Sequence, residues 1–246
     1  MLSIDKAGSY QTAEKQVNVI TEGEVVLYLN GDCQIDVQAE RQTKLHLVNR
    51  QSGKLKVVCQ ISGNLVLTAT HLDCGELDLY LAAELLAPEA RIKTVSATIS
   101  GSDSHLEYTI NHCENATYSE VNNYGIGLAD CGYDCVIKAR IPKGSKGSEA
   151  YQNTRILTAG TVDKVKVLPI LQMEENEIKA KHACSIGRLD QEQKYYLAMR
   201  GLDETAVLQL TAKGYLSNIL REITDKKLSE ELTELIESQV INICTM

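Results

Sequence analysis

The stretch that decides the fold is Glu177–Tyr215, EIKAKHACSIGRLDQEQKYYLAMRGLDETAVLQLTAKGY. It begins with the two-residue period of a strand and ends with the spacing of helices, so we interpret it as the joint between two architectures. Its strand part places five residues on one apolar side: Ile178, Ala180, His182, Cys184 and Ile186. Either His182 and Cys184 are a core histidine and a buried free thiol, or they are a pair of ligands for a metal or cluster.

Upstream of this joint, from about residue 24, the sequence is a series of short alternating runs. Examples are KLHLVN (44–49), KLKVVCQIS (54–62), ELDLYLAA (76–83) and HLEYTINHC (105–113). Each has the period of a half-buried strand, and turn residues such as Asn30-Gly31-Asp32 separate the runs. This spacing is typical of an all-β sandwich, barrel or solenoid. No strict repeat is visible, so the residues alone leave sandwich and solenoid open.

Downstream of Ile186 the spacing becomes helical. Capping residues, glycines and apolar stripes predict four short amphipathic helices, at about 190–200, 203–214, 216–223 and 229–243. Asp190 followed by Gln193 resembles a capping box, and Gly214 is expected to end the second helix. We therefore expect a β domain over residues 1–187 and a helical domain over residues 188–246.

The composition limits the classes of function. The chain has 246 residues, a net charge of −8 and scattered basic residues, which argues against nucleic acid as the main partner. It has no Trp and no Phe, so base-stacking platforms are not expected. The sequence shows no signal-peptide pattern and no membrane-spanning apolar run. We expect a cytoplasmic protein that binds no membrane and whose thiols are reduced.

The eight cysteines include no C-x-x-C pair, so neither a zinc ribbon nor a thioredoxin-type site is encoded. Cys113 ends an alternating run, and Cys131 and Cys135 bracket three residues that could form a turn. As thiolates these three cysteines could accept sulfur or bind a soft metal. As protonated thiols they could be inert packing, and both interpretations stay open here.

No local sequence motif indicates an enzyme. Gly144-Ser145-Lys146-Gly147-Ser148 lacks the spacing of a phosphate-binding loop and is interpreted as a connecting turn. A nucleophile elbow and a recognisable carboxylate pair for glycoside chemistry are both missing.

The residues around the joint match a longer pattern. Its members are Pro169, His182, Gly187, Asp190, Gln193, Tyr196-Leu197, Arg200-Gly201-Leu202 and Gly214-Tyr215, preceded by similar stretches at 123–127, 141–144 and 155–157. In these residues the sequence resembles the SufB/SufD family, the scaffold subunits of the SUF iron–sulfur cluster assembly machinery, and it is more similar to SufD. The resemblance is strong over about residues 99–223 and weak before them.

The resemblance implies a right-handed parallel β-helix followed by a small α-helical domain. Scaffold subunits of the family pair through their β-helices, and the histidine matching His182 lies near that interface as a proposed ligand of a transient iron–sulfur cluster. The helical end docks the ABC-type ATPase SufC. The resemblance therefore implies a docking role for Tyr196, Leu197, Arg200, Gly201 and Leu202, and it implies no nucleotide site on this chain.

Three departures from the family pattern matter. The chain is short, so its first residues are expected to enter the first coils already. SufB has a cysteine in the strand before the site and a glutamate after the histidine, whereas this chain has Asn153, Thr154 and Ala183 at these places, which favours a SufD-like role. Cys184 stands where we expect a small residue, so it is either an additional thiolate ligand or a small apolar group.

The leading hypothesis is thus a non-catalytic scaffold subunit. It would pair with a SufB-like chain or with itself, bind SufC through residues 188–224 and hold a nascent cluster beside His182. An alternative from another class is a β-solenoid enzyme acting on polysaccharide, which would need a groove of carboxylates and usually aromatic residues or a secretion signal. A third possibility is a degenerate paralogue that only assembles the complex.

Overall fold

The computed structural model describes residues 1–49, 51–72, 75–127, 131–158, 164–188 and 190–245, with side chains up to Ile241. The strands of sheet A are β1 (Leu2–Ile4), β3 (Gln16–Val19), β5 (Cys33–Ala39), β7 (Gly53–Ile61), β9 (Leu77–Leu85), β11 (Ser104–His112), β13 (Tyr133–Ile141) and β15 (Val165–Met173). The strands of sheet B are β2 (Gly8–Thr12), β4 (Gly23–Leu29), β6 (Gln42–Asn49), β8 (Asn64–His71), β10 (Arg91–Ser100), β12 (Tyr118–Gly127), β14 (Glu149–Thr158) and β16 (Lys179–Gly187).

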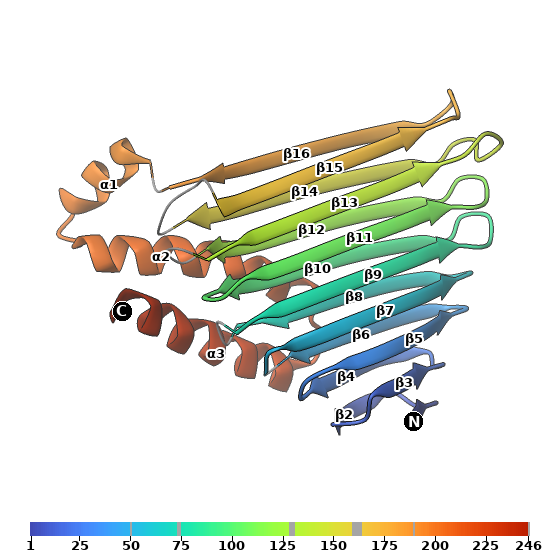
Figure 1. The fold of residues 1–246 in the computed structure, drawn as a ribbon, viewed down its shortest axis with the longest axis horizontal. Coiled ribbons are helices and arrows are strands. Elements are labelled where there is room, and N and C mark those ends of the chain that lie inside the picture. Colours follow the sequence, from blue (N-terminus) through green and yellow to red (C-terminus); the bar gives the residue numbers. More distant parts are fainter. Residues whose placement is uncertain (50, 73–74, 128–130, 159–163, 189, 246) are drawn as a thin grey trace.

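The chain passes alternately from one sheet to the other, so each coil adds one strand to each sheet (Figure 1). Neighbouring strands within a sheet are parallel and in register. On sheet B, for example, Val25 pairs with Leu45, and Leu45 pairs with Leu67. Parallel stacking of successive coils defines a mainly β, solenoid fold, the parallel β-helix. The solenoid expectation is confirmed, and the antiparallel sandwich is excluded.

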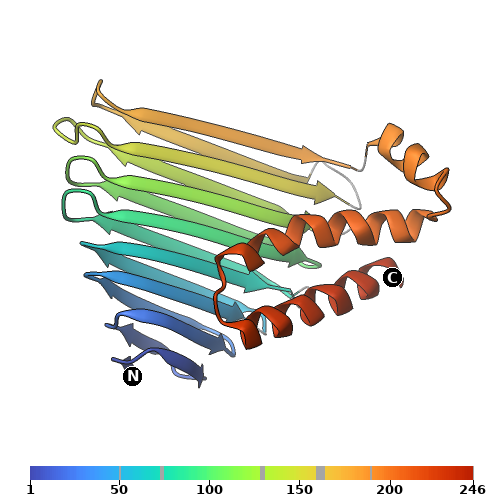
Figure 2. The same cartoon turned by 180° about the vertical axis from the view of Figure 1, so that it is seen from behind.

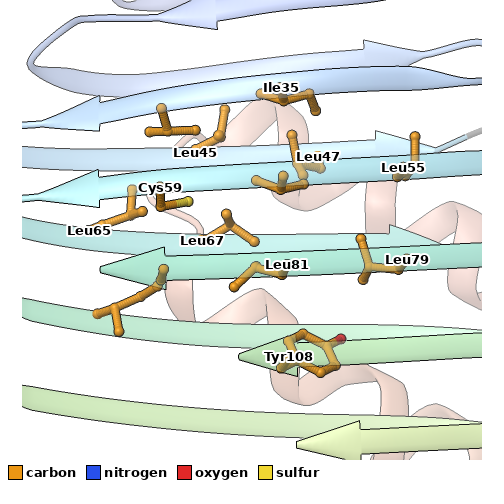
Figure 3. Close-up of a cluster of buried hydrophobic side chains, with 14 of the residues drawn as sticks. Ile35, Leu45, Leu47, Leu55, Cys59, Leu65, Leu67, Leu79, Leu81 and Tyr108 are labelled. Carbon is orange, nitrogen blue, oxygen red and sulfur yellow. The ribbon is translucent and has the colours of Figure 1, made fainter. Parts of the chain in front are cut away.

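The space between the two sheets is a continuous core. In the N-terminal coils its side chains are almost all aliphatic, and Figure 3 shows Leu45, Leu47 and Leu67 of sheet B facing Leu79 and Leu81 of sheet A. Each fully buried leucine contributes about 1.5–3 kcal/mol relative to an exposed one. A slip of one residue would turn a whole strand's leucines to solvent, so the alternating runs fix the register.

The coils lengthen steadily along the chain. One inward column of sheet A runs through Leu2, Val17, Ile35, Val57, Leu81, Tyr108, Ile137 and Pro169. The steps between these residue numbers are 15, 18, 22, 24, 27, 29 and 32. The strands lengthen too, from three residues in β1 to nine in β15. The solenoid therefore widens toward its C-terminal end.

The helices are α1 (Gln191–Ala198), α2 (Glu204–Leu216), the 3₁₀ helix η2 (Ser217–Glu222) and α3 (Lys226–Thr245). The side chains of Asp190 and Asp203 cap α1 and α2 by accepting hydrogen bonds from backbone N–H groups of the first turn, as the sequence predicts. Two expectations were wrong. Gly214 lies inside α2 and η2 follows without a break, because the burial of Leu216 and Ile219 outweighs the roughly 1 kcal/mol helix penalty of glycine. The last helix begins at Lys226 instead of Ser229.

The helices α2 and α3 lie side by side across the outer face of sheet B (Figure 2). A second apolar cluster joins them to the sheet: Val95, Ala97 and Ile99 of β10 pack with Val207, Leu216, Ile219, Ile236 and Val240. The helix α1 contacts α2 and has no buried residue. Within the described part of the chain, no helix is long and apolar enough to cross a membrane.

Glu24 of β4 fastens the start of α3 to the solenoid. Its carboxylate accepts hydrogen bonds from the backbone N–H groups of Thr224 (3.1 Å) and Asp225 (3.2 Å) and from the Thr224 hydroxyl. The buried His46 donates its Nε2–H to the same carboxylate at 2.8 Å. Burial would raise the pKa of Glu24, but these hydrogen bonds, led by Thr224 and His46, outweigh it and hold the pKa at about 2. We call this contact the Glu24 latch.

Candidate functional site

The site forms on β16, which pairs with β14 and is the last strand of sheet B in the described chain. On β14, alternate residues face the core and are buried. These inward residues pair in order with those of β16: Ala150 with Ala180, Gln152 with His182, Thr154 with Cys184, and Ile156 with Ile186. The period of two therefore predicted the correct inward side for His182 and Cys184.

The inward side of β16 is not covered. In the described residues no further coil stacks on β15 and β16, and both His182 and Cys184 are exposed, while Ala180 and Ile186 are half-buried. In the sequence pattern, an inward-facing residue is expected to be buried. Here the two properties differ, because an inward-facing residue of the last coil is still open to solvent. The pair lies at the open end of the solenoid, side by side on one strand.

The columns below the pair change from apolar to polar along the solenoid. The column that ends at His182 contains Val25, Leu45, Leu67, Thr94, Val121 and Gln152. The column that ends at Cys184 contains Leu27, Leu47, Ala69, Ser96, Asn123 and Thr154. Polar side chains buried in a core require partners, which costs packing energy elsewhere. The core is therefore more polar beneath the open end than in the first coils.

A hydrogen-bonded group occupies the core beneath the open end. Asn123 accepts from the Ser96 hydroxyl at 2.8 Å, and its Nδ2 donates to Tyr133 Oη at 3.0 Å and to Cys135 Sγ at 3.2 Å. Cys135 is 1% exposed. Burial raises the pKa of its thiol to about 12, so the protonated form prevails at neutral pH.

The other cysteine candidates lie apart from one another. Cys113 is exposed just after the C-terminal end of β11, and burial, with Glu84 and Glu114 nearby, raises its pKa. Cys131 precedes β13, where its Sγ contacts the Gly101 carbonyl oxygen. The two residues therefore lie at opposite ends of sheet A, on the order of 30 Å apart for a nine-residue strand. The turn considered between Cys131 and Cys135 does not reach Cys135, which lies within β13.

The thiol of Cys184 differs from that of Cys135 in access. Partial burial raises the pKa of Cys184 as well, but the residue is exposed at the open end. A metal ion can displace the thiol proton, since coordination and deprotonation are coupled. In the described residues, no group of three or more His, Cys, Asp or Glu side chains is arranged to hold a metal ion. His182 and Cys184 together offer two potential donor groups at this end, one imidazole and one thiol.

The expected docking residues surround the end of α1. Tyr196 is 55% exposed, and the Arg200 guanidinium lies over its ring, 4.9 Å from the centroid. Leu197 and Leu202 are partly buried against the cluster shared with sheet B, so they position α1 more than they present a surface. Gly201 has φ +85°, which allows the turn between α1 and α2.

Three exposed apolar side chains on or directly after α1 and on α2 were missed by the sequence-based expectation. Tyr195, Met199 and Leu210 are 69%, 72% and 54% exposed. Tyr195 also lines a hollow between α1 and α2, together with Ala198 and Leu202. A helical-wheel argument assigns apolar residues to the core side, so exposure of this kind has no local signal.

Residues 8–215 match the family model described as SUF system FeS cluster assembly, SufBD core domain. The chain belongs to the SufBD family. The matched residues include all of the solenoid from β2 onward, the site on β16 and most of α2. The family is one of iron–sulfur cluster assembly proteins, so the open end with His182 and Cys184 belongs to a SufBD core.

Similar proteins carry the same family name. The iron-sulfur cluster assembly protein SufD of Bacillus subtilis (strain 168) is 31% identical over 101 residues, covering 41% of this chain and 23% of that protein. A SufBD family protein of Mycobacterium tuberculosis (strain ATCC 25618 / H37Rv) is 31% identical over 108 residues, 44% of this chain and 26% of that protein. Another SufBD family protein from the same strain is 23% identical over 163 residues, which cover 65% of this chain and 19% of that protein. The matches span about a quarter or less of these relatives.

Proposed function

We propose that this chain is a scaffold subunit of the SUF machinery that holds a nascent iron–sulfur cluster at the open end of its solenoid. The observation that carries the proposal is the exposure of His182 and Cys184 at the head of two columns whose other members lie in the core. Imidazole and thiolate are both suitable iron ligands, and mixed ligation is known for iron–sulfur clusters. The cluster is cargo that the scaffold passes on, and the chain performs no catalysis.

The two donor groups at the open end support a shared site. A cluster is held by about four protein ligands, and His182 and Cys184 supply two. A second scaffold subunit, either SufB-like or identical, would complete the set by covering the open end. The edges of β15 and β16, which no further strand pairs within the described residues, suit this role, because an exposed edge offers backbone N–H and C=O groups to another chain. Pro169 lies on one of these edge strands, where a missing N–H is tolerated.

The turn between α1 and α2 is the proposed dock for the SufC-type ABC ATPase. Tyr195, Tyr196 and Met199 supply exposed apolar area, and Arg200 supplies a charge stacked on the Tyr196 ring. Aromatic residues, methionine and arginine are the side chains most enriched in protein interfaces. We place the assembly in the cytoplasm, since the described cysteines are free thiols and reducing compartments keep them so.

Anaerobic reconstitution tests the ligand role. The chain, alone and with a co-purified scaffold partner, is mixed with iron and sulfide, and the charge-transfer absorption is recorded. His182→Ala should weaken this absorption several-fold, whereas His105→Ala, which removes an exposed histidine from the outer face of sheet A, should not. An unchanged spectrum in His182→Ala would remove His182 from the ligand set.

A further inference from the structure

Gln152 of β14 is a buried amide with one unused hydrogen-bonding group. The residue is 4% exposed, and its Nε2 donates to the backbone carbonyl oxygen of Ile170 at 3.2 Å. A carbonyl oxygen can only accept a hydrogen bond, so the NH₂ group of Gln152 must face the Ile170 carbonyl. The amide oxygen of Gln152 therefore points the other way. Among the described residues, this Oε1 has no hydrogen-bond partner. Buried amide oxygens are rarely left in this state, so the exception requires a reason.

The position of Gln152 suggests a reason for its unpaired amide oxygen. Its neighbour on β16 in the parallel register is His182, and both residues belong to the same inward column. Adjacent strands are about 4.8 Å apart, so side chains of neighbouring residues on one face lie within reach of each other. On the other side the neighbour is Val121, whose side chain has no donor. The imidazole of His182 is therefore the side chain next to Gln152 in this column that can donate an N–H.

We propose that Gln152 is the positioning residue of His182. The structure does not contain this hydrogen bond: the imidazole of His182 would turn toward Gln152 and donate one ring N–H to the unpaired Oε1, which would fix the tautomer and leave the other nitrogen unprotonated at the open end. Histidines that bind metals almost always donate their second ring nitrogen to an oxygen, which sets the orientation of the ring. This inference rests on the proposed ligand role of His182 and names the group that prepares it.

The tautomer is measured on the metal-free full chain labelled with ¹⁵N-histidine. Spectra are recorded at pH 8, and the His182 signals are assigned with His182→Gln. Wild-type His182 should populate one tautomer. Gln152→Met should give a mixture of both, and Gln152→Glu, which keeps an oxygen acceptor at the same place, should keep one. Gln172→Met is the matched control, since it changes an exposed glutamine on β15.

Cobalt(II) titration of the same variants gives the second readout. Gln152→Met should weaken the binding that depends on His182 by about 10- to 100-fold, with Gln152→Glu and Gln172→Met close to wild type. An unchanged tautomer in Gln152→Met, or a mixture in Gln152→Glu, overturns the inference whatever His182→Ala does to metal binding. If Gln152→Met alters the tautomer but cobalt binding does not depend on His182, Gln152 positions the ring and the ligand role of His182 fails.

Discussion

Cys184 and Cys135 both point into the interior of the solenoid, but Cys184 is exposed on the last strand of sheet B while Cys135 is 1% exposed on β13 of sheet A. The same residue type on the same side of a strand thus meets two environments. The position of a thiol along the solenoid therefore decides whether reagents and metals can reach it.

We therefore expect thiol labelling to separate the two residues. A maleimide should label Cys184 and the exposed Cys113 in the native protein, and Cys135 only after denaturation. Labelling of Cys184 should accelerate with pH, because its thiol pKa is raised. Peptide mass spectrometry gives the extent at each site.

The same assay reports on pairing. A scaffold partner that covers the open end should protect Cys184 and leave Cys113 reactive, since Cys113 lies beyond the end of β11. Equal rates for Cys184 in the free chain and in the complex would contradict pairing through this end.

The Glu24 latch should stabilise the attachment of α3. The substitution Glu24→Gln removes the negative charge that the Thr224 and Asp225 N–H groups and His46 now share, so it should lower the free energy of unfolding by about 1–3 kcal/mol. Hydrogen exchange should rise around residues 224–232. Glu22→Gln is the control, since Glu22 forms an exposed ion pair with Arg41.

The latch also predicts a dependence on pH. The pKa of Glu24 is about 2 in the folded chain, below its ordinary value of 4.5. The stabilisation is therefore complete above about pH 4.5 and is lost as the pH falls toward 2. Thermal melts over this range should show a smaller loss in Glu24→Gln than in wild type, and equal slopes would argue against the latch.

Gly63 lies at a turn where no side chain fits. A Cβ there would be 2.5 Å from the carbonyl oxygen of Arg41 and 2.6 Å from that of Glu40, both backbone atoms. Gly63→Ala should destabilise the chain by about 1–3 kcal/mol in a denaturant titration. Gly187→Ala, with nothing within 4 Å of its Cβ, should remain near wild type, and equal stability of the two variants would show that the turn can relax.

Met199→Lys should weaken binding of the ATPase at least tenfold in a pull-down with the purified partner, because it places a charge in the apolar area at the end of α1. The melting temperature should not change, since the Met199 side chain is 72% exposed. Ile20→Lys alters an exposed apolar side chain in the N-terminal coils and should bind normally. Equal affinity of the two variants for the ATPase would show that the ATPase does not bind at the end of α1.

Much of this fold could be predicted from local patterns. The period of two indicated the strands and the inward side of β16, and the capping residues indicated the starts of α1 and α2. The repeat itself was hidden, because the distance between stacked residues grows from 15 at Leu2 to 32 at Tyr133, so no fixed period exists in the sequence. The solenoid could be inferred only through family resemblance.

The sequence could name candidate site residues but not their environment. His182 was named from the resemblance, yet its exposure depends on where stacking ends, which no local pattern contains. Gln152 lies 30 residues earlier in the chain and becomes its neighbour only through the coil length. Tyr195 and Met199 were missed because an apolar residue on a helix is ordinarily assigned to the core.

The lengthening of the coils makes the first and the last described coil unequal. The strands at the N-terminal end have three and five residues, and those at the C-terminal end have nine each. A strand of nine residues offers more backbone N–H and C=O groups than a strand of three or five residues can pair with. Within the described coils, the edge formed by β15 and β16 can therefore be paired along its full length only by strands of similar length.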